Sequence, residues 1–217
     1  MPWDRHWAVT HDSSKFDGSA WAHCRNFMIG ARTPGLAGIW AEFDEVVHLS
    51  TLRHQDIGSV TFDPDGDPDV FLDWVAPLCP ADRATATGIV KAQDCGMTDS
   101  PFPSVSIMNR ASHAAVEGAL GAPLETQRWR ANIWIDGFSP WEETTWMGKT
   151  LRIGSAEFEV REPCERCMLT ATNPITGQRD TDTLGVLQSA FGHKNFGVYA
   201  VVTKNGHVTC GDTCEVL

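Results

Sequence analysis

The sequence is poor in tyrosine and in positive charge. It holds one tyrosine against nine tryptophans and ten phenylalanines, and 17 lysines and arginines against 28 aspartates and glutamates, which gives a formal net charge of −11. A protein of this charge repels phosphate backbones, so we expect no nucleic-acid partner. No apolar run approaches the roughly 18 residues of a membrane-spanning helix, so we also expect no membrane association.

Targeting and nucleotide-binding patterns are missing as well. Residues 1–6 show neither the apolar core of a signal peptide nor the Arg- and Ser-rich pattern of a transit peptide, so we expect an unexported, cytoplasmic protein. The chain contains no GxGxxG and no GxxxxGK[ST] sequence, which argues against a Rossmann site and a P-loop. A composition of 42% apolar and 21% charged residues is ordinary for a globular protein of one large or two small domains.

Short strand patterns joined by turns dominate the sequence. We expect strands at 7–10, 39–43, 46–52, 104–108 and 129–135, hairpins at 151–160 and 196–209, and helices at 70–76, 112–120 and 183–190. Ser112 is the expected N-cap of the second helix, Asp182 that of the third, and Asn205-Gly206 the expected turn of the second hairpin. The pattern predicts a mostly β protein with small helices (α+β), built as an antiparallel β-barrel rather than a doubly wound parallel sheet.

One acidic cluster, residues 63–69, combines four aspartates with glycine and proline. Its carboxylates raise the possibility of a calcium loop. An EF-hand needs a bidentate glutamate at its twelfth position and tolerates no proline at these positions, so a plain turn is the favoured interpretation.

Seven cysteines in a chain without an export signal point to thiols rather than disulfides. Two pairs stand out, Cys164 with Cys167 and Cys210 with Cys214. Three chemistries remain open for them: a tetrahedral zinc site, a dithiol redox pair, or one functional thiolate at Cys167, which Arg166 beside it would favour. Small buried thiols without chemistry are the plain alternative, and we expect the C-terminal pair to be structural.

Four ordered segments resemble the MOSC domain, the C-terminal domain of molybdenum cofactor sulfurases. They are the cysteine segment 162–177, the strand–helix junction 104–112, the Arg-x-Arg-x-Asn segment 128–133, and the closing segment 196–200 with Gly211-Asp212. A fifth, residues 4–9, resembles the D-R-x-W motif of the β-barrel domain that precedes MOSC in amidoxime-reducing proteins. The resemblance implies a MOSC-type barrel at 99–217 and a partial N-terminal β-rich subdomain at 1–98.

The resemblance also implies a molybdenum–molybdopterin cofactor and the residues that hold it. Cys167 is the expected metal ligand and catalytic residue, because a thiolate suits a metal already bound to sulfur. Arg5, Arg130, Asn132 and Arg166 are the expected cofactor-binding residues, since arginine gives planar contacts to phosphate and the strand at 129–135 would place Arg130 and Asn132 on one face.

The function implied by the resemblance is reduction of small N-hydroxylated compounds to amines. No flavin or haem motif is visible, so electrons would come from a partner protein that carries flavin, haem or an iron–sulfur cluster. The alternatives are a sulfur carrier that uses a Cys167 persulfide, and a cofactor carrier or delivery protein. The resemblance implies pyridoxal phosphate binding as well. The chain starts just before the D-R-x-W motif, so we expect an upstream Lys-Ser strand to be absent and cofactor retention to be weakened.

Overall fold

The computed structural model describes residues 3–16, 20–93 and 96–217. The chain forms two compact units: an N-terminal unit of Met1–Pro103 with Ala171–Thr181, and a C-terminal unit of Ser104–Thr170 with Asp182–Leu217. Residues 171–181 therefore fold with the N-terminal unit, and the predicted domain boundary at 98/99 stays a prediction. No helix in the described part of the chain combines the length and apolar character needed to cross a bilayer.

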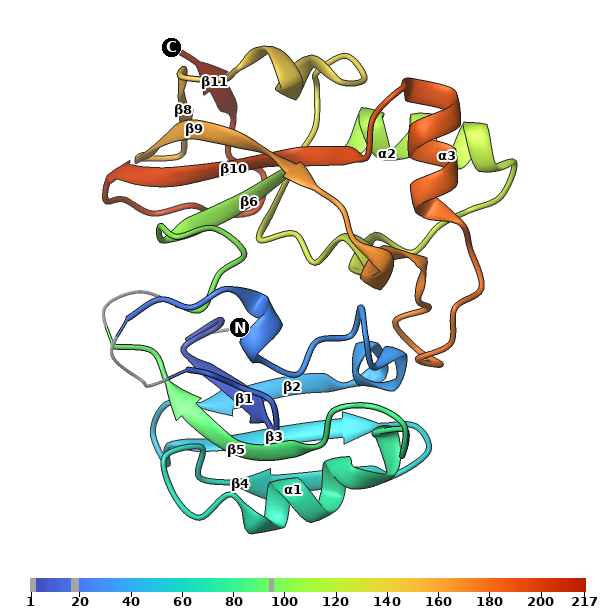
Figure 1. Cartoon of the computed structure of the whole chain (residues 1–217). Coiled ribbons are helices and arrows are strands. Elements are labelled where there is room, and N and C mark those ends of the chain that lie inside the picture. The colour runs from blue at the N-terminus through green and yellow to red at the C-terminus, as the bar shows by residue number, and fades with distance from the viewer. Residues whose placement is uncertain (1–2, 17–19, 94–95) are drawn as a thin grey trace. The chain divides into compact units, whose positions relative to one another are not determined.

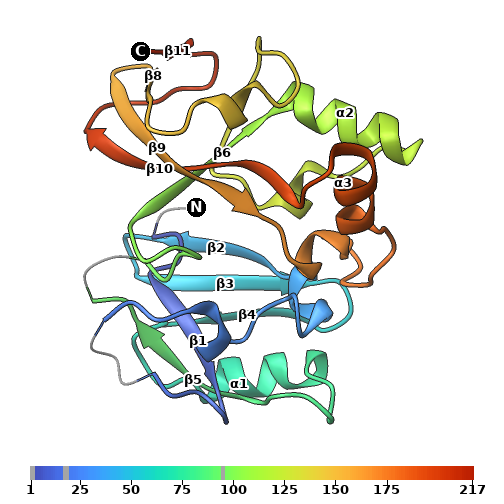
Figure 2. The ribbon, with the colours of Figure 1, turned by 45° about the horizontal axis from the view of Figure 1, so that its top comes forward.

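The described residues of the N-terminal unit form two small antiparallel sheets and one α-helix (Figure 1). Its strands are β1 (Trp7–His11) paired with β5 (Ala86–Lys91), and β2 (Trp40–Asp44), β3 (Leu49–His54) and β4 (Gly58–Phe62) in that order. Helix α1 (Asp69–Val75) packs against β4 and β5, as Figure 2 shows. The strands expected at 7–10 and 39–43 and the helix at 70–76 are confirmed to within one residue at each end. The strand expected at 46–52 begins only at Leu49, because residues 45–48 form the turn before it. Strand β4 was not predicted because Val60 is its one buried residue.

The acidic turn between β4 and α1 ties two strands together. The carboxylate of Asp65 accepts hydrogen bonds from Trp7 Nε1 at 2.7 Å and from Lys91 Nζ at 2.6 Å. Burial raises the pKa of Asp65, but the bonds from Lys91 and Trp7 outweigh it and lower that pKa below its ordinary value. The carboxylate therefore holds β1 and β5 to this turn.

The C-terminal unit contains one six-stranded sheet in the order β11-β8-β9-β10-β6-β7, which curls into a half-barrel (Figure 1). The strands are β6 (Ser104–Asn109), β7 (Ile133–Ile135), β8 (Thr150–Ile153), β9 (Ala156–Glu165), β10 (Asn195–Lys204) and β11 (Cys214–Val216). Every pair is antiparallel except β6 with β7. The molecule is thus mostly β, as expected, with a mixed rather than purely antiparallel sheet.

One face of this sheet carries the core. Along β9 the side chains alternate, so that Ala156, Phe158 and Val160 are buried while the residues between them are more exposed. They pack against the other apolar members of the core: Ile107, Ile135, Trp146, Leu151, Ile153, Val198 and Ala200. The predicted hairpin at 151–160 is confirmed, with Gly154 at φ +59° in its turn.

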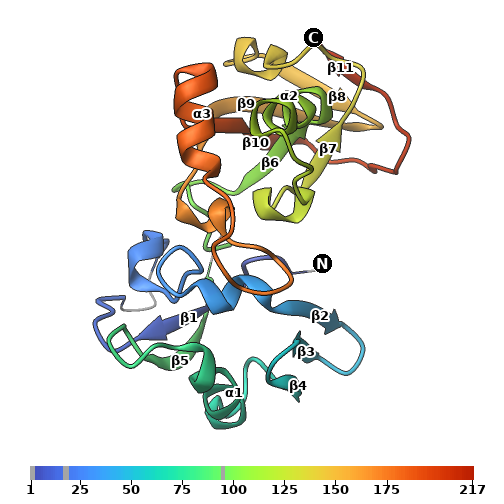
Figure 3. The same cartoon turned by 90° about the vertical axis from the view of Figure 1, so that its right-hand side faces the viewer.

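Helices α2 (Arg110–Leu120) and α3 (Thr183–Phe191) contact each other, and Figure 3 looks along α2 with α3 beside it. Asp182 caps α3 as predicted, accepting a hydrogen bond from Gly185 N at 2.9 Å. The expected cap of α2 is wrong, because the side chain of Asn109 accepts a hydrogen bond from Ala111 N and caps the helix, three residues before Ser112. Six 3₁₀ turns complete the described elements: Cys24–Asn26, Pro34–Gly38, Ala76–Leu78, Thr126–Trp129, Glu142–Thr145 and Met168–Ala171.

The strand predicted at 129–135 is correct only for its last three residues. Residues 126–129 form a 3₁₀ turn, and Arg130 then takes a left-handed conformation at φ +53°. The alternation of apolar residues is misleading here because Trp129 is buried by stacking on Phe196, with ring centroids 3.9 Å apart, and not by lying on a sheet face.

The second predicted hairpin is wrong in its return strand. Gly206 does not take the positive φ that a type I′ turn needs; it lies against the backbone of Ser155, where a Cβ would collide. His207 then exchanges bonds with the β8–β9 turn through Ser155. The chain consequently returns not to β10 but to β8, which pairs with β11.

Candidate functional site

Cys167 follows the end of β9 and precedes the 3₁₀ turn Met168–Ala171, and its side chain is exposed. Residues 168–171 do not continue the extended chain of β9. Thr170 donates from its N–H (3.2 Å) and its hydroxyl (3.1 Å) to the carbonyl of Cys167, and these two bonds close the turn. The thiol thus stands on a tight turn directly after a long central strand.

After Cys167, the turn is fixed by a buried pair of hydroxyls. Thr170 Oγ1 lies 2.7 Å from Oγ1 of Thr183, the first residue of α3, and these residues are 3% and 0% exposed. Because both hydroxyls are buried, neither can replace this hydrogen bond with one to water, so the bond restrains both side chains. The position of the Cys167 carbonyl is therefore tied to the start of α3.

Before Cys167, the turn is fixed by the side chain of Arg166. Its guanidinium donates to the Phe196 carbonyl from Nε (2.9 Å) and Nη2 (2.6 Å) and to the Trp129 carbonyl from Nη1 (3.1 Å). It also lies 3.0 Å from the Met108 sulfur and within 5.9 Å of the centroids of the Trp129 and Phe196 rings. These contacts hold the residue next to Cys167 inside the unit, and the role of Arg166 as a cofactor contact stays a prediction.

A glycine in β10 makes this arrangement possible. Gly197 has φ +76°, and a Cβ there would overlap the Met108 sulfur and come within 2.7 Å of the Ile107 carbonyl. Only glycine lets β10 approach β6 this closely next to the carbonyl of Phe196 that Arg166 uses. Sequence reasoning missed Gly197, Thr170 and Thr183 as supports of the cysteine turn, although the first two lie inside the quoted segments.

Arg130 and Asn132 lie in the C-terminal unit on the connection between Trp129 and β7. The side chain of Asn132 accepts hydrogen bonds from Ser106 N (3.0 Å) and Ser106 Oγ (2.8 Å), so its carboxamide oxygen extends the β6–β7 pairing. Arg130 is exposed, and its left-handed backbone replaces the strand geometry that was expected to align the two side chains.

The carbonyl of Trp129 accepts a hydrogen bond from Arg166, and the indole ring of Trp129 is held by a buried histidine. Its Nε1–H donates to His113 Nδ1 at 3.0 Å, and His113 Nε2 lies 3.0 Å from the Leu124 carbonyl. This pairing fixes the proton on Nε2, because Nδ1 is the acceptor. Burial lowers the pKa of His113, which favours the neutral ring in the folded protein.

Arg5 belongs to the N-terminal unit. Its guanidinium pairs with Asp4 at 2.8 Å, its backbone has φ +58°, and its carbonyl accepts from Met97 N at 2.8 Å. The residue is therefore held against the segment that follows β5, within its own unit. The other expected cofactor residues, Arg130, Asn132, Arg166 and Cys167, all belong to the C-terminal unit.

The other three cysteines of the two pairs differ in their surroundings. Cys164 is fully buried on β9, Cys210 is exposed, and Cys214 packs against the core of the C-terminal unit. Burial, with a smaller contribution from Glu215, raises the pKa of the Cys214 thiol to about 11. Within residues 3–16, 20–93 and 96–217, no three His, Cys, Asp or Glu side chains are grouped to hold a metal ion, so these residues do not form the four-cysteine zinc site.

Comparisons with known proteins agree with the motifs. A model of the MOSC domain family matches residues 97–215, more than half of the chain. Three similar curated proteins are named molybdenum cofactor sulfurase. The protein from Drosophila persimilis is 34% identical over 143 residues, that from Drosophila melanogaster 34% over 120, and that from Drosophila grimshawi 36% over 119. These matches cover 62%, 51% and 51% of this chain.

The same matches cover 17%, 15% and 15% of the relatives, so the chain spans about a sixth of their length. Among solved structures, the crystal structure of YiiM from Geobacillus stearothermophilus is 18% identical, with a TM-score of 0.41, and the match covers 52% of this chain and 53% of that chain.

Proposed function

Because this chain belongs to the MOSC domain family, we propose that it binds a molybdenum–pterin cofactor through the thiolate of Cys167 and reduces N-hydroxylated compounds to amines. The observation that carries the proposal is the exposed thiol of Cys167 on a turn held by Arg166 and Thr170. A soft sulfur ligand on a fixed backbone is what a metal already bound to sulfur requires.

The donor set of the C-terminal unit fits such a cofactor. Cys167 supplies the soft ligand, and Arg130 supplies an exposed cation that suits phosphate in an otherwise acidic chain. We assign Asn132 to the pterin, as the family resemblance implies, and a role of Arg5 at the phosphate stays a prediction. Arg166 is a positioning residue in this proposal, because its guanidinium is committed to internal carbonyls. Binding of pyridoxal phosphate stays a prediction.

When bound, the cofactor would supply two-electron oxygen transfer from the N–OH group. The chain's own residues would bind the cofactor, hold Cys167 in one orientation and admit the small substrate at an exposed turn. The sequence shows no flavin or haem motif, so a partner protein with flavin, haem or an iron–sulfur cluster would deliver the electrons.

A second candidate is favoured by the names of the relatives, which are molybdenum cofactor sulfurases. In that role Cys167 would carry a persulfide and hand sulfur to a cofactor. The same exposed, fixed thiol serves this chemistry, since a persulfide must reach an acceptor outside the protein. A carrier that only delivers the cofactor is the non-catalytic form of the same proposal.

One experiment separates the candidates. The chain is produced in a host that makes the cofactor, and the loaded protein is mixed with reduced viologen and an N-hydroxylated base such as benzamidoxime. The reductase proposal predicts formation of the amidine, with Cys167→Ser inactive and Cys210→Ser active. Loaded protein that forms no amidine refutes the reductase, and thiocyanate released by cyanide from Cys167 would then establish the sulfur carrier.

A further inference from the structure

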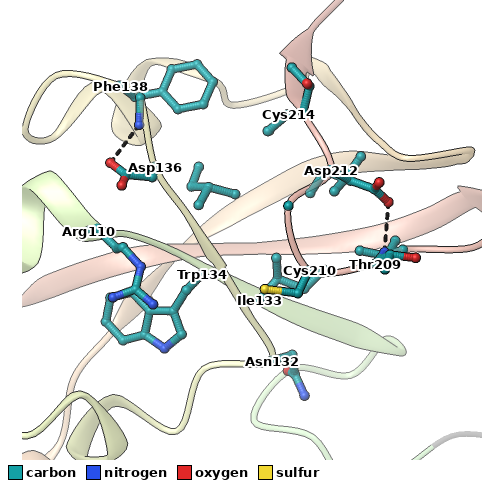
Figure 4. A pocket seen from close by; sticks show the side chains of 16 residues that line it. Arg110, Asn132, Ile133, Trp134, Asp136, Phe138, Thr209, Cys210, Asp212 and Cys214 are labelled. Carbon is teal, nitrogen blue, oxygen red and sulfur yellow. Dashed lines mark hydrogen bonds between the residues drawn. The ribbon is translucent and has the colours of Figure 1, made fainter.

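The two ends of the C-terminal sheet face one cavity. Among the strands that the structure describes, β7 pairs with β6 alone and β11 with β8 alone. Both strands border a cavity of about 820 Å³ (Figure 4). Its wall on one side is β7 with residues 136–138, and on the other side it is the segment 208–214, which leads into β11. The half-barrel therefore has an opening between its two edge strands.

The backbone of β7 offers unused hydrogen-bonding groups to this cavity. The N–H of Asn132 donates to the Ser106 carbonyl at 3.1 Å, which places it on the β6 side. Peptide groups alternate along a strand, so the N–H and C=O groups of Ile133 and Ile135 point to the opposite side. No further strand of the described residues pairs with β7 there, and an unpaired edge of this kind is a template for an added strand.

The cavity also contains an unpaired cation. Arg110 is the first residue of α2, and its guanidinium lies 5.9 Å from the centroid of the Trp134 ring (Figure 4). It makes no ion pair with the residues that the structure describes, in a chain of net charge −11. The first turn of a helix disfavours a positive charge, so the helix itself gives no reason for an arginine here.

The two acidic residues of the cavity do not neutralise Arg110. The carboxylate of Asp136 accepts from Gly137 N at 2.8 Å, and that of Asp212 accepts from Thr209 N at 2.7 Å. Each carboxylate thus shapes its own loop. Apolar side chains, among them Phe138, Ile153 and Val208, line the space between.

We propose that this cavity binds an extended peptide segment of a partner protein, which adds a strand to the outer edge of β7 and places a carboxylate beside Arg110. The unpaired peptide groups of Ile133 and Ile135 select an extended backbone, and the apolar wall accepts every second side chain. Arg110 adds charge complementarity for an acidic residue. The cavity is also lined by Asn132, which the proposed function assigns to the pterin, whereas Cys167 does not line it. The peptide proposal rests on β7 and Arg110, so it stands whether or not the proposed enzymatic function holds.

The test uses the full chain and an acetylated pentapeptide of alternating threonine and valine that ends in glutamate. Titration calorimetry measures its affinity, and amide hydrogen exchange measures protection of Ile133 and Ile135. We expect binding with slowed exchange at both amides. Arg110→Gln should weaken binding roughly tenfold or more, as loss of a charge-assisted bond implies. Asp136→Asn is the matched control on the same cavity and should change affinity by less than about threefold.

A second peptide with the same sequence but N-methylated amides keeps the carboxylate and cannot pair with an edge strand. The proposal predicts that it binds at least tenfold more weakly. Equal binding of both peptides would overturn strand addition. Displacement of the peptide by millimolar succinate, without protection of the Ile133 and Ile135 amides, would make the cavity a small-anion site instead. Sedimentation that shows a dimer protecting these amides without peptide would assign the edge to a second copy and refute the proposal.

Discussion

Cys167 and Cys210 are both exposed, yet the backbones that carry them differ. The turn of Cys167 is held by the Arg166 guanidinium on one side and by the buried Thr170–Thr183 hydroxyl pair on the other. Cys210 lies in residues 205–213, which form no strand or helix and are exposed throughout. Its nearest fixed points are the Thr209–Asp212 turn and the contact of His207 with Ser155.

Exposure alone therefore does not single out a functional thiol in this chain. A ligand must keep its geometry when the metal binds, and a residue whose position is already determined loses less entropy in doing so. The Cys167 turn meets this condition through contacts to β6, β10, α3 and Trp129. The Cys210 segment borders an open cavity, which suits a surface that adapts to a partner.

Gly197→Ala should have the largest effect on the structure that supports the Cys167 turn. A methyl group there overlaps the Met108 sulfur and strains a backbone at φ +76°, and we expect a loss of about 3 kcal/mol or more in the free energy of unfolding. Urea denaturation measures it. Gly118→Ala in α2, where a Cβ meets nothing within 4 Å, should instead stabilise by about 0.5–1 kcal/mol. Equal effects of the two variants would refute the close approach of β10 to β6.

Arg166→Met should cost about 2–4 kcal/mol, because the carbonyls of Phe196 and Trp129 lose their donor. The matched control is Arg161→Met, which removes an exposed arginine of β9 that pairs with Glu159 and should cost under about 1 kcal/mol. Chemical denaturation measures both. A stable Arg166→Met protein would show that the guanidinium does not fix the turn and would return Arg166 to the set of cofactor contacts.

Thr170→Val should cost about 1–2 kcal/mol, since the side chain keeps its shape and loses the bonds to Cys167 and Thr183. Thr144 makes the same hydroxyl bond to a carbonyl three residues back, but at an exposed site. Thr144→Val should therefore cost less than about 0.5 kcal/mol. If thermal unfolding shows that the two variants lose the same stability, the buried Thr170 hydroxyl does not help to hold the Cys167 turn.

The smallest effect concerns pH. Burial lowers the pKa of His113 below its ordinary 6.5, so the unfolded chain binds this proton more readily than the folded one. The contribution of the neutral ring is present above pH 6.5 and is lost as the pH falls below that value. Wild-type protein should lose more stability between pH 7.5 and 5.5 than His113→Gln does. If the free energy of unfolding depends on pH in the same way in both proteins, His113 is not a buried neutral ring with a lowered pKa.

The sequence predicted those parts of the fold that local patterns decide. The hairpin at 151–160 and the Asp182 cap of α3 each depend on a few neighbouring residues, and each was predicted. The cap of α2 was misplaced within its own segment, and the larger errors occur where distant packing decides. Trp129 is buried by Phe196, which lies far along the chain, and Gly206 is needed against Ser155 rather than in a turn.

The candidate site shows the same division. Cys167 and its neighbours could be named from a contiguous segment that resembles a family. The buried supports, Thr183 and Met108 among them, come from α3 and β6, and nothing in a single sequence links them to the cysteine. The cavity at β7 was invisible for the same reason, because its two walls are opposite ends of one sheet.

The central claim is that the fixed thiol, and not the other exposed thiol, holds the metal. Molybdenum per chain, measured by mass spectrometry after production in a cofactor-making host, tests it directly. The account predicts that Cys167→Ser retains molybdenum only at background level, while Cys210→Ser retains the wild-type amount. Wild-type molybdenum in Cys167→Ser, or equal loss in both variants, would contradict it.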